Sequence, residues 1–393
     1  MASERSSAGR SESPLQAARR IAPLAAERAE QTERERALGP DLLGELRDGG
    51  LMRMCLPRAL GGEEAEPAEM IEAIEVLARG DGAAAWCAMI ASTSSLLGAY
   101  LPPAEAQAIY DGGRTITGGV FAPRGRAERR GEEFTVSGRW SFVSGVGHCS
   151  WVMGGCVVAS DGTVETLDSG APDVRLMLMP IDGVEVIDTW SVSGLRGTGS
   201  HDIVAHELTV PASRSASMFS DRPQHPGALY SFPLFGMLAA GIATVALGIA
   251  RAAIDDLVAL AAVKTPAASA KSLAERAVVQ SQVAHADAAQ RAARALLLEQ
   301  ARESWHAAVA GGSIPVEQRL GLRLAASHAA EAAATATTAM YHAGGGSSIY
   351  DSSPLQRRLR DVHVATQHMM IAPPSWELAG RLLLSLPTDT AQL

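Results

Sequence analysis

Residues 138–145 read Gly-Arg-Trp-Ser-Phe-Val-Ser-Gly, in a chain of 393 residues. The aromatic and branched side chains favour a β-strand, and the final glycine allows a tight turn directly after it. Similar short runs rich in Thr, Val, Ile, Phe and Trp recur on both sides, between Gly and Asp turns. They predict strands at residues 134–136, 140–143, 151–158, 174–179, 184–187 and 203–210. This spacing is typical of a small β-barrel or sandwich.

Helix-favouring sequence flanks this β region on both sides. Residues 13–110 carry apolar side chains three and four positions apart, which is typical of helices with one buried face. Long helices are also predicted at residues 232–261, 272–309, 315–343 and 354–370, with a short one after Pro374. The predicted fold class is therefore α+β. Its parts are a flexible tail (1–12), an N-terminal α-helical domain (13–112), a central β domain (113–225) and a C-terminal four-helix bundle (226–393).

The composition indicates an ordinary globular protein. Hydrophobic residues make up 47% of the chain and charged residues 20%, which excludes a disordered or fibrous protein. The net charge is −9. Because binding to phosphates needs a surplus of Lys and Arg, this charge argues against nucleic acid as a partner.

The sequence also predicts where the protein resides. Its four cysteines form no CxxC pair, and its first 13 residues are polar where a secretory signal would be apolar, so we expect reduced thiols and a cytoplasmic protein. Residues 232–250 carry no charge and could span a membrane by length. Their many Gly and Ala residues, and the charges from Arg251 onward, predict instead a buried helix and no membrane association.

Two further motifs follow residues 138–145 along the chain. Residues 193–202 read Ser-Gly-Leu-Arg-Gly-Thr-Gly-Ser-His-Asp, and residues 344–347 read Gly-Gly-Gly-Ser ahead of Arg360 and Asp361. In this order the three motifs resemble the flavin-facing strand, the second β-domain signature, and the late glycine turn and helix of the acyl-CoA dehydrogenase superfamily. The resemblance extends over most of the chain. It implies the three-part fold described above and a homotetramer.

The position of the catalytic base separates the chemistries of this superfamily. Acyl-CoA dehydrogenases need a carboxylate to remove a weakly acidic proton. In many of them it lies eight residues after the Arg-Asp pair, where this chain has Met369, and a second location, the helix starting near Phe232, holds no acid before Asp255. His368, one residue before Met369, instead matches the flavin-dependent, two-component (group D) monooxygenase branch.

This branch implies a specific activity. The protein is expected to be the oxygenase component of a two-component monooxygenase, which takes reduced flavin (FMN or FAD) from a separate NAD(P)H:flavin reductase and binds O2. A C4a-(hydro)peroxyflavin then hydroxylates a small aromatic or heteroaromatic substrate, or an amine. Two alternatives stay open: an acyl-CoA dehydrogenase or oxidase that uses an acid from elsewhere, such as Asp255 or Glu377, and a binding protein that keeps the fold without catalysis.

The resemblance implies roles for particular residues. His368 and Ser144 are the predicted catalytic residues, because a histidine of near-neutral pKa can move a proton and a small hydroxyl fits beside flavin N5. His363 lies five positions from His368, so the two histidines face apart, and no metal site is expected. The predicted cofactor-binding residues are Gly119, Val120, Phe121, Phe142, Ser144, Gly145, Gly345, Gly346 and Ser347.

The substrate pocket is predicted from residues that face the flavin in this architecture. They come from an early helix, the turn after residues 138–145, the start of the first bundle helix and the residue after His368. The predicted pocket residues are Trp86, Met89, Ser92, Thr93, His148, Phe232, Phe235 and Met369. The phosphate-binding loop of the dehydrogenases is reduced here to Pro123-Arg124-Gly125, which implies that flavin is held weakly and exchanges with a pool.

Overall fold

The computed structural model describes residues 12–218, 220–267 and 269–393. Its N-terminal part is helical, as expected. The tail predicted at residues 1–12 lies outside the described residues except for Glu12, whose carboxylate binds Arg20 at 2.9 Å. The helices of this part are α1 (Pro14–Glu35), α2 (Pro40–Asp48), α3 (Pro67–Gly80), α4 (Gly82–Ser94) and α5 (Pro103–Tyr110).

The central part is a mixed β-sheet. Its hydrogen-bonded order is β6-β7-β2-β1-β3-β5-β8, with β4 paired to β3. β1 pairs in parallel with β3 and antiparallel with β2. The strands are β1 (Thr117–Arg130), β2 (Glu133–Val143), β3 (Trp151–Ser160), β4 (Thr163–Val164), β5 (Val174–Pro180), β6 (Glu185–Ile187), β7 (His201–Pro211) and β8 (Ser215–Ala216).

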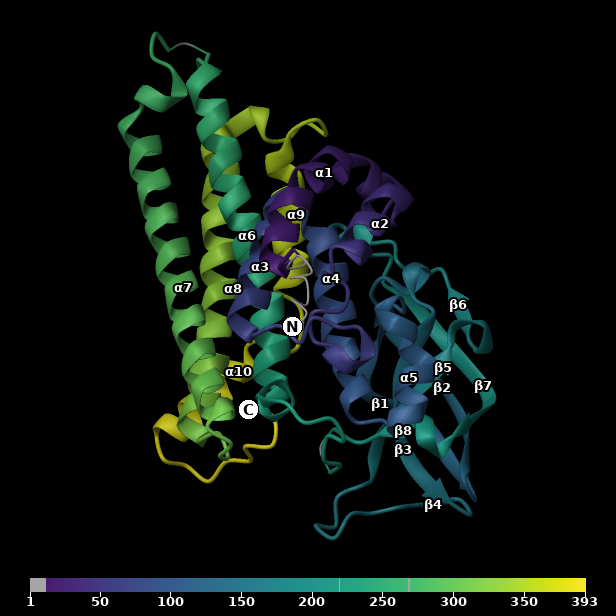
Figure 1. The fold of residues 1–393 in the computed structure, drawn as a ribbon. Coiled ribbons are helices and arrows are strands. Elements are labelled where there is room, and N and C mark those ends of the chain that lie inside the picture. Colours follow the sequence, from purple (N-terminus) through teal and green to yellow (C-terminus); the bar gives the residue numbers. More distant parts are fainter. Residues whose placement is uncertain (1–11, 219, 268) are drawn as a thin grey trace, which may run out of the picture.

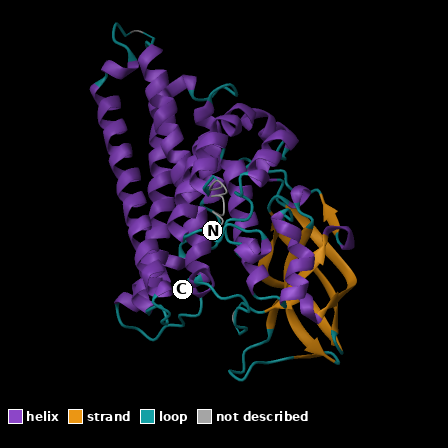
Figure 2. Cartoon of the chain, in the orientation of Figure 1, coloured by secondary structure: helices purple, strands orange, loops and turns teal. Residues whose placement is uncertain are grey.

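Long helices form the C-terminal part. Figure 2 shows the sheet on one side of the N-terminal helices and the helical bundle on the other. The expected acyl-CoA dehydrogenase-like arrangement of helices, sheet and bundle is confirmed, whereas the domain limits at residues 112 and 225 stay predictions. The helices are α6 (Leu234–Val263), α7 (Ala277–Val309), α8 (Val316–Gly344), α9 (Pro354–Ala365) and α10 (Pro374–Leu383).

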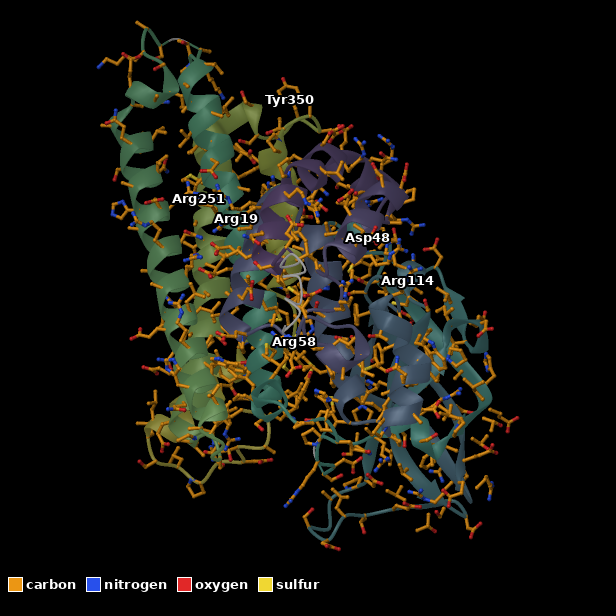
Figure 3. All side chains as sticks on the ribbon, viewed as in Figure 1. Arg19, Asp48, Arg58, Arg114, Arg251 and Tyr350 are labelled. Carbon is orange, nitrogen blue, oxygen red and sulfur yellow. The ribbon has the colours of Figure 1, made fainter. Side chains whose placement is uncertain are left out.

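Small residues let α6 lie at the centre of the molecule. A Cβ on Gly248 would lie 2.5 Å from the backbone oxygen of Glu75 on α3, and one on Gly241 would lie 2.8 Å from the Met89 side chain on α4. By length and composition α6 could cross a membrane, but 89% of its most apolar window is buried within the structure. We therefore interpret α6 as a core helix. Its charged end faces α7, where Arg251 binds Asp287 at 2.5 Å (Figure 3).

Two of the sequence motifs meet where the sheet domain contacts α9. The Asp361 carboxylate accepts a hydrogen bond of 2.6 Å from the Leu195 amide. A Cβ on Gly194 would lie 2.4 Å from the backbone of Arg360, so only glycine fits at this crossing. The Arg360 guanidinium also binds the Ser193 carbonyl at 2.7 Å. These contacts fix the start of the segment that leads to His368.

The prediction of one helix over residues 354–370 is wrong at its end. α9 ends at Ala365, and the chain continues in turns in which the His368 amide donates to the Ala365 carbonyl at 3.2 Å. The prolines at 373 and 374 fix the backbone of the next segment and begin α10. His368 therefore lies in the turn between α9 and α10, and not on a helix.

Candidate functional site

Trp86 and Ser144 form the centre of the candidate site. Trp86 lies on α4, whose N-terminus is capped by Asp81, and Ser144 follows directly after β2. The indole Nε1 donates to the Ser144 hydroxyl oxygen at 3.0 Å, and both residues are buried. The bond joins the N-terminal helical domain to the end of the flavin-facing strand implied by the sequence.

A chain of hydroxyls continues from Ser144. Its oxygen lies 2.7 Å from the Ser200 hydroxyl, which lies 2.7 Å from that of Thr198, which donates to the Leu195 carbonyl at 2.8 Å. The Trp86 N–H can only donate and the Leu195 carbonyl can only accept, so each hydroxyl can donate to the next along this chain. Turning the Ser200 proton toward Ser144 frees the Ser144 proton for a bound molecule, but Thr198 can then donate only to Ser200 or to the Leu195 carbonyl, so one bond of the chain is lost.

His368 packs against Trp86 from the C-terminal domain. The two ring centroids are 5.9 Å apart with the planes tilted by 59°. The Met370 amide donates to His368 Nδ1 at 3.3 Å, which places the proton of the neutral ring on Nε2. Burial, and then the charge of Arg323, lowers the pKa of His368 to about 4. The expectation of a near-neutral pKa is corrected: the imidazole is neutral at physiological pH, because its surroundings disfavour the charged form.

An exposed rim lies beside Ser144. Phe142 is 71% exposed, has a φ of 69° and touches Trp190 edge-on, with the ring centroids 6.2 Å apart. A large aromatic side chain held outward in this strained backbone conformation is a signature of a ligand-contacting position. Gly145 follows in the left-handed region at φ 69°, and Val120 and Phe121 on β1 are half-buried. An exposed ring, a buried hydroxyl and a tight glycine turn fit one flat, partly polar ring system such as a flavin.

Other predicted cofactor residues lie elsewhere in the chain. Gly119 packs tightly on β3, where a Cβ would lie 2.1 Å from the Met153 carbonyl oxygen. The turn of Gly345, Gly346 and Ser347 packs at the far end of α6, where Lys264 binds the Gly344 carbonyl at 2.6 Å. Since α6 meets α4 from Gly241, beside Met89, to Ile249, beside Gly82, this turn lies roughly 20–35 Å along the helix at 1.5 Å per residue. One chain alone does not bring it to Ser144.

Two predicted pocket residues, Ser92 and Thr93, form hydrogen bonds within the protein. Ser92 is buried, accepts from the Met54 amide and donates to the Leu51 carbonyl at 2.9 Å. Thr93 donates to the Met89 carbonyl on its own helix at 2.9 Å. The partners of both hydroxyls lie within the protein, and their place in the substrate pocket stays a prediction.

The remaining predicted residues have varied surroundings. His148 is partly buried and its Nε2 accepts from the Leu38 amide at 3.2 Å, which engages the ring with the N-terminal domain. Phe232 is buried and Phe235 half-buried at the start of α6, while Met369 is 63% exposed beside His368. His363 binds Thr338 at 3.0 Å between Nε2 and Oγ1 on the other side of this turn. Their roles stay predictions.

Three residues of this site were not predicted from the sequence. Ser200 and Thr198 form the hydroxyl chain, and both lie in the motif at residues 193–202, where their polar character was a visible signal. Arg323 lies within α8 and is buried near His368. In the sequence, Arg323 looks like an arginine on the solvent-exposed face of a helix, so nothing nearby marked it as buried.

The acids considered as alternative bases lie outside this group. Asp255 is exposed on α6 and pairs with Arg251 at 2.8 Å and with Arg79 at 3.1 Å. Glu377 is exposed on α10. Neither carboxylate is placed to remove a proton from a molecule bound beside Ser144.

Comparisons with known proteins agree with this geometry. The chain matches the family models described as acyl-CoA dehydrogenase, N-terminal domain, over residues 12–102, and acyl-CoA dehydrogenase, C-terminal domain, over residues 240–373. An indole-3-acetate monooxygenase of Pseudomonas putida is 32% identical, with 89% of this chain and 88% of that protein covered. The FADH2-dependent resorcinol hydroxylase, oxygenase component, of a Rhizobium species is 28% identical, with 92% and 91% covered.

A solved structure extends the likeness to three dimensions. The HsaA monooxygenase from M. tuberculosis superimposes with a TM-score of 0.88 at 26% identity, with 98% of this chain and all of that chain covered. The chain belongs to the flavin-dependent monooxygenases that share the acyl-CoA dehydrogenase fold. It is an oxygenase component that acts with reduced flavin and O2, and the names of its relatives as oxygenase subunits or components imply a separate reductase as partner.

Proposed function

We propose that this oxygenase component hydroxylates a small aromatic or heteroaromatic substrate, with the substrate ring held beside Trp86 and His368. The observation that carries the proposal is the buried hydrogen bond from Trp86 to Ser144, together with the packing of His368 on the same indole ring. A flat aromatic substrate packs favourably on such rings. Two relatives at 32% and 30% identity are named indole-3-acetate monooxygenases, which supports a bicyclic heteroaromatic ring.

The residues of this chain have distinct tasks in the proposal. Reduced flavin with O2 supplies the oxygen atom that the substrate receives. Phe142, Ser144 and Gly145, with Val120 and Phe121, would hold the flavin ring. The Ser144 hydroxyl would be free to donate to it when the Ser200 proton turns toward Ser144. The neutral imidazole of His368 holds a proton at Nε2 that it can give and recover, and its burial keeps water away from the reacting atoms.

We propose further that the chain works as a cytoplasmic homotetramer with either FMN or FAD. The separation between Ser144 and the turn of residues 345–347 supports an assembly, because this turn could then reach the flavin of a neighbouring subunit through its backbone N–H groups. Sedimentation of the purified protein tests this part. A monomer at micromolar concentration would contradict it.

The reaction is tested with isotopically labelled oxygen. The protein is mixed with chemically reduced FMN or FAD, ¹⁸O2 and indole-3-acetate, indole or resorcinol, and the products are analysed by mass spectrometry. One ¹⁸O atom in a ring-hydroxylated product is expected. Transfer of ¹⁸O only to H2O2 with all three compounds, or anaerobic bleaching of oxidised flavin by an acyl-CoA, would contradict the proposal.

A further inference from the structure

Arg323 is a buried cation without an acidic partner. It lies near the start of α8 and is 5% exposed. Its guanidinium donates to the Phe235 carbonyl at 3.4 Å, to Met370 Sδ at 3.5 Å and to the Ser375 hydroxyl at 3.1 Å, and its Nε–H has no acceptor. Within residues 12–218, 220–267 and 269–393, no carboxylate lies at ion-pair distance from it.

An equally buried arginine in the same chain is paired. Arg358 is also 5% exposed, but it binds the Asp256 carboxylate at 3.4 Å and the carbonyls of Arg79 and Gly80 at 3.1 Å. Burying a charge without a counter-charge is strongly unfavourable. The buried charge of Arg323 therefore indicates a stabilising partner that is not among the described residues.

One edge of the Arg323 guanidinium, formed by Nε and Nη2, is only partly satisfied by the described residues. Along one edge, Nε–H and an Nη2–H point the same way and bind two carboxylate oxygens side-on. In Arg323 the Nε–H of this edge is buried and unpaired, Nη2 donates to the Ser375 hydroxyl, and all three neighbouring acceptors are neutral. An anion is therefore the partner that this environment lacks.

Arg323 lies next to the proposed reaction site. Met370, whose sulfur it contacts, follows His368 by two residues, and Phe235, whose carbonyl it contacts, was predicted to wall the substrate pocket. The charge of Arg323 also acts on His368 directly, as one cause of the lowered pKa of that ring. An acidic group at Arg323 and an aromatic ring at His368 would thus belong to one small molecule.

We infer that the substrate is an aromatic acid, and that Arg323 binds its carboxylate while its ring lies beside Trp86 and His368. This inference rests on the proposed function and adds the substrate class to it. Arg323 would then make an acid bind more tightly than a neutral compound with the same ring. Removing one half of a charge-assisted, two-fold hydrogen bond weakens binding by about 10- to 100-fold.

Calorimetric binding tests the inference without turnover. Indole-3-acetate and the neutral 3-methylindole are titrated into the protein, with and without excess FMN. The parent is expected to bind the acid at least about 10-fold more tightly than the neutral compound. Arg323→Met is expected to lose about 10- to 100-fold in affinity for the acid and to leave the affinity for 3-methylindole unchanged.

Matched variants separate recognition from folding. Arg319→Met makes the same change one turn earlier on α8, where the guanidinium binds the Thr390 carbonyl at 3.2 Å and the Nε–H is likewise unpaired among the described residues. It should keep the affinity for the acid, because it is Arg323, not Arg319, that contacts Met370 and the Phe235 carbonyl. Arg323→Met should melt at or above the parent temperature, because it removes an unpaired buried charge. If that variant does not fold, Arg323→Lys replaces it in the test. Lysine keeps the positive charge but lacks the planar guanidinium that binds two carboxylate oxygens, so this variant should also weaken acid binding.

Three results would overturn the inference. The parent could bind both compounds equally, or Arg323→Met could bind the acid as the parent does. The third is that Ser327→Val loses acid binding while Arg323→Met keeps it. Ser327 has a buried hydroxyl without a partner and lines a separate hollow of about 560 Å³ together with Ile371 and Trp376. Failure of the proposed function appears differently, as absence of ¹⁸O transfer to any ring even where binding is measured.

Discussion

The indole nitrogen of Trp86 lies 3.0 Å from the hydroxyl oxygen of Ser144 and donates a hydrogen bond to it. The ring of His368 packs against the same indole. The three residues come from the N-terminal helices, the end of β2 and the turn between α9 and α10, so all three parts of the fold meet at one tryptophan. A change in any part can therefore alter the orientation of the Ser144 hydroxyl.

Trp86→Phe removes the indole N–H while keeping an aromatic ring beside His368. Loss of one buried hydrogen bond lowers the free energy of unfolding by about 0.5–1.5 kcal/mol, and the freed Ser144 hydroxyl reduces the product formed per reduced flavin. Thermal melts and the ratio of product to H2O2 measure both effects. Trp376→Phe, on the half-exposed start of α10, is the matched control and should change neither. An unchanged ratio in Trp86→Phe would mean that this bond does not orient the site.

Ser144→Ala removes the hydroxyl on which the flavin assignment depends. We expect H2O2 to increase relative to product by about 2- to 10-fold, the equivalent of one hydrogen bond. Ser144→Thr retains a hydroxyl and should lie closer to the parent. Quantifying H2O2 and hydroxylated product from the same reaction checks this. If Ser144→Ala couples oxygen to product as the parent does, Ser144 does not contact the flavin.

His368→Gln should change how stability depends on pH. The folded-state pKa of His368 is lowered from 6.5 to about 4, chiefly by burial. The neutral ring therefore stabilises the fold above about pH 6.5, and this contribution is lost as the pH falls through about 4. Glutamine does not titrate. The melting temperature of the variant should therefore fall by less than that of the parent when the pH is lowered from 7 to 4.5. His206→Gln, on an exposed strand position, should behave as the parent. Equal losses in all three proteins would show that His368 is not held neutral.

Asp361→Asn should change the pH dependence of stability in the opposite direction. Burial raises the pKa of Asp361 to about 7. Between about pH 4 and 7 the unfolded chain ionises this group while the folded protein keeps its proton, so stability falls as the pH rises. Asparagine retains the oxygen that accepts from the Leu195 amide and cannot ionise. The melting temperature of the variant should exceed that of the parent by more at pH 8 than at pH 5, and a constant difference would refute this account of Asp361.

Gly194→Ala tests the contact that positions the segment before His368. Its Cβ would lie 2.4 Å from the Arg360 backbone, so the loop and α9 must separate. Such overpacking costs about 1–3 kcal/mol of stability. Gly147→Ala, where a Cβ meets nothing within 4 Å, is the control and should melt as the parent. Melting curves that coincide for both variants would contradict the tight crossing.

The helices were largely predictable from the sequence, whereas β1 was not. Apolar periodicity sets the lengths of α6, α7 and α8 within a few residues. β1 (Thr117–Arg130) contains three glycines, Pro123 and several charges, and it forms because β2 and β3 pair with it on both sides. That pairing is tertiary and leaves no local signal. The early end of α9 likewise depends on the turns that precede Pro373.

The candidate site was predictable where a motif carried it. Ser144 and His368 were assigned by resemblance and Trp86 as a pocket residue, and the structure brings the three together. Arg323 was missed because its unpaired state is a property of its surroundings. The turn of residues 345–347 was assigned to the same site, yet it lies beside Lys264 just beyond the C-terminal end of α6, because the sequence motif does not record where the fold places the turn.

The most direct test of the account is the single-turnover rate of product formation in His368→Ala against the parent. Each protein is mixed with reduced flavin, ¹⁸O2 and an aromatic substrate that the parent hydroxylates, after both are shown to be folded by thermal melting. The account predicts that the parent transfers ¹⁸O to the ring and that His368→Ala does so about 10²- to 10⁴-fold more slowly, the usual contribution of a group that moves a proton. His363→Ala, whose ring binds Thr338 on the other side of the turn, should remain near the parent rate. A folded His368→Ala that forms labelled product at the parent rate would contradict the account.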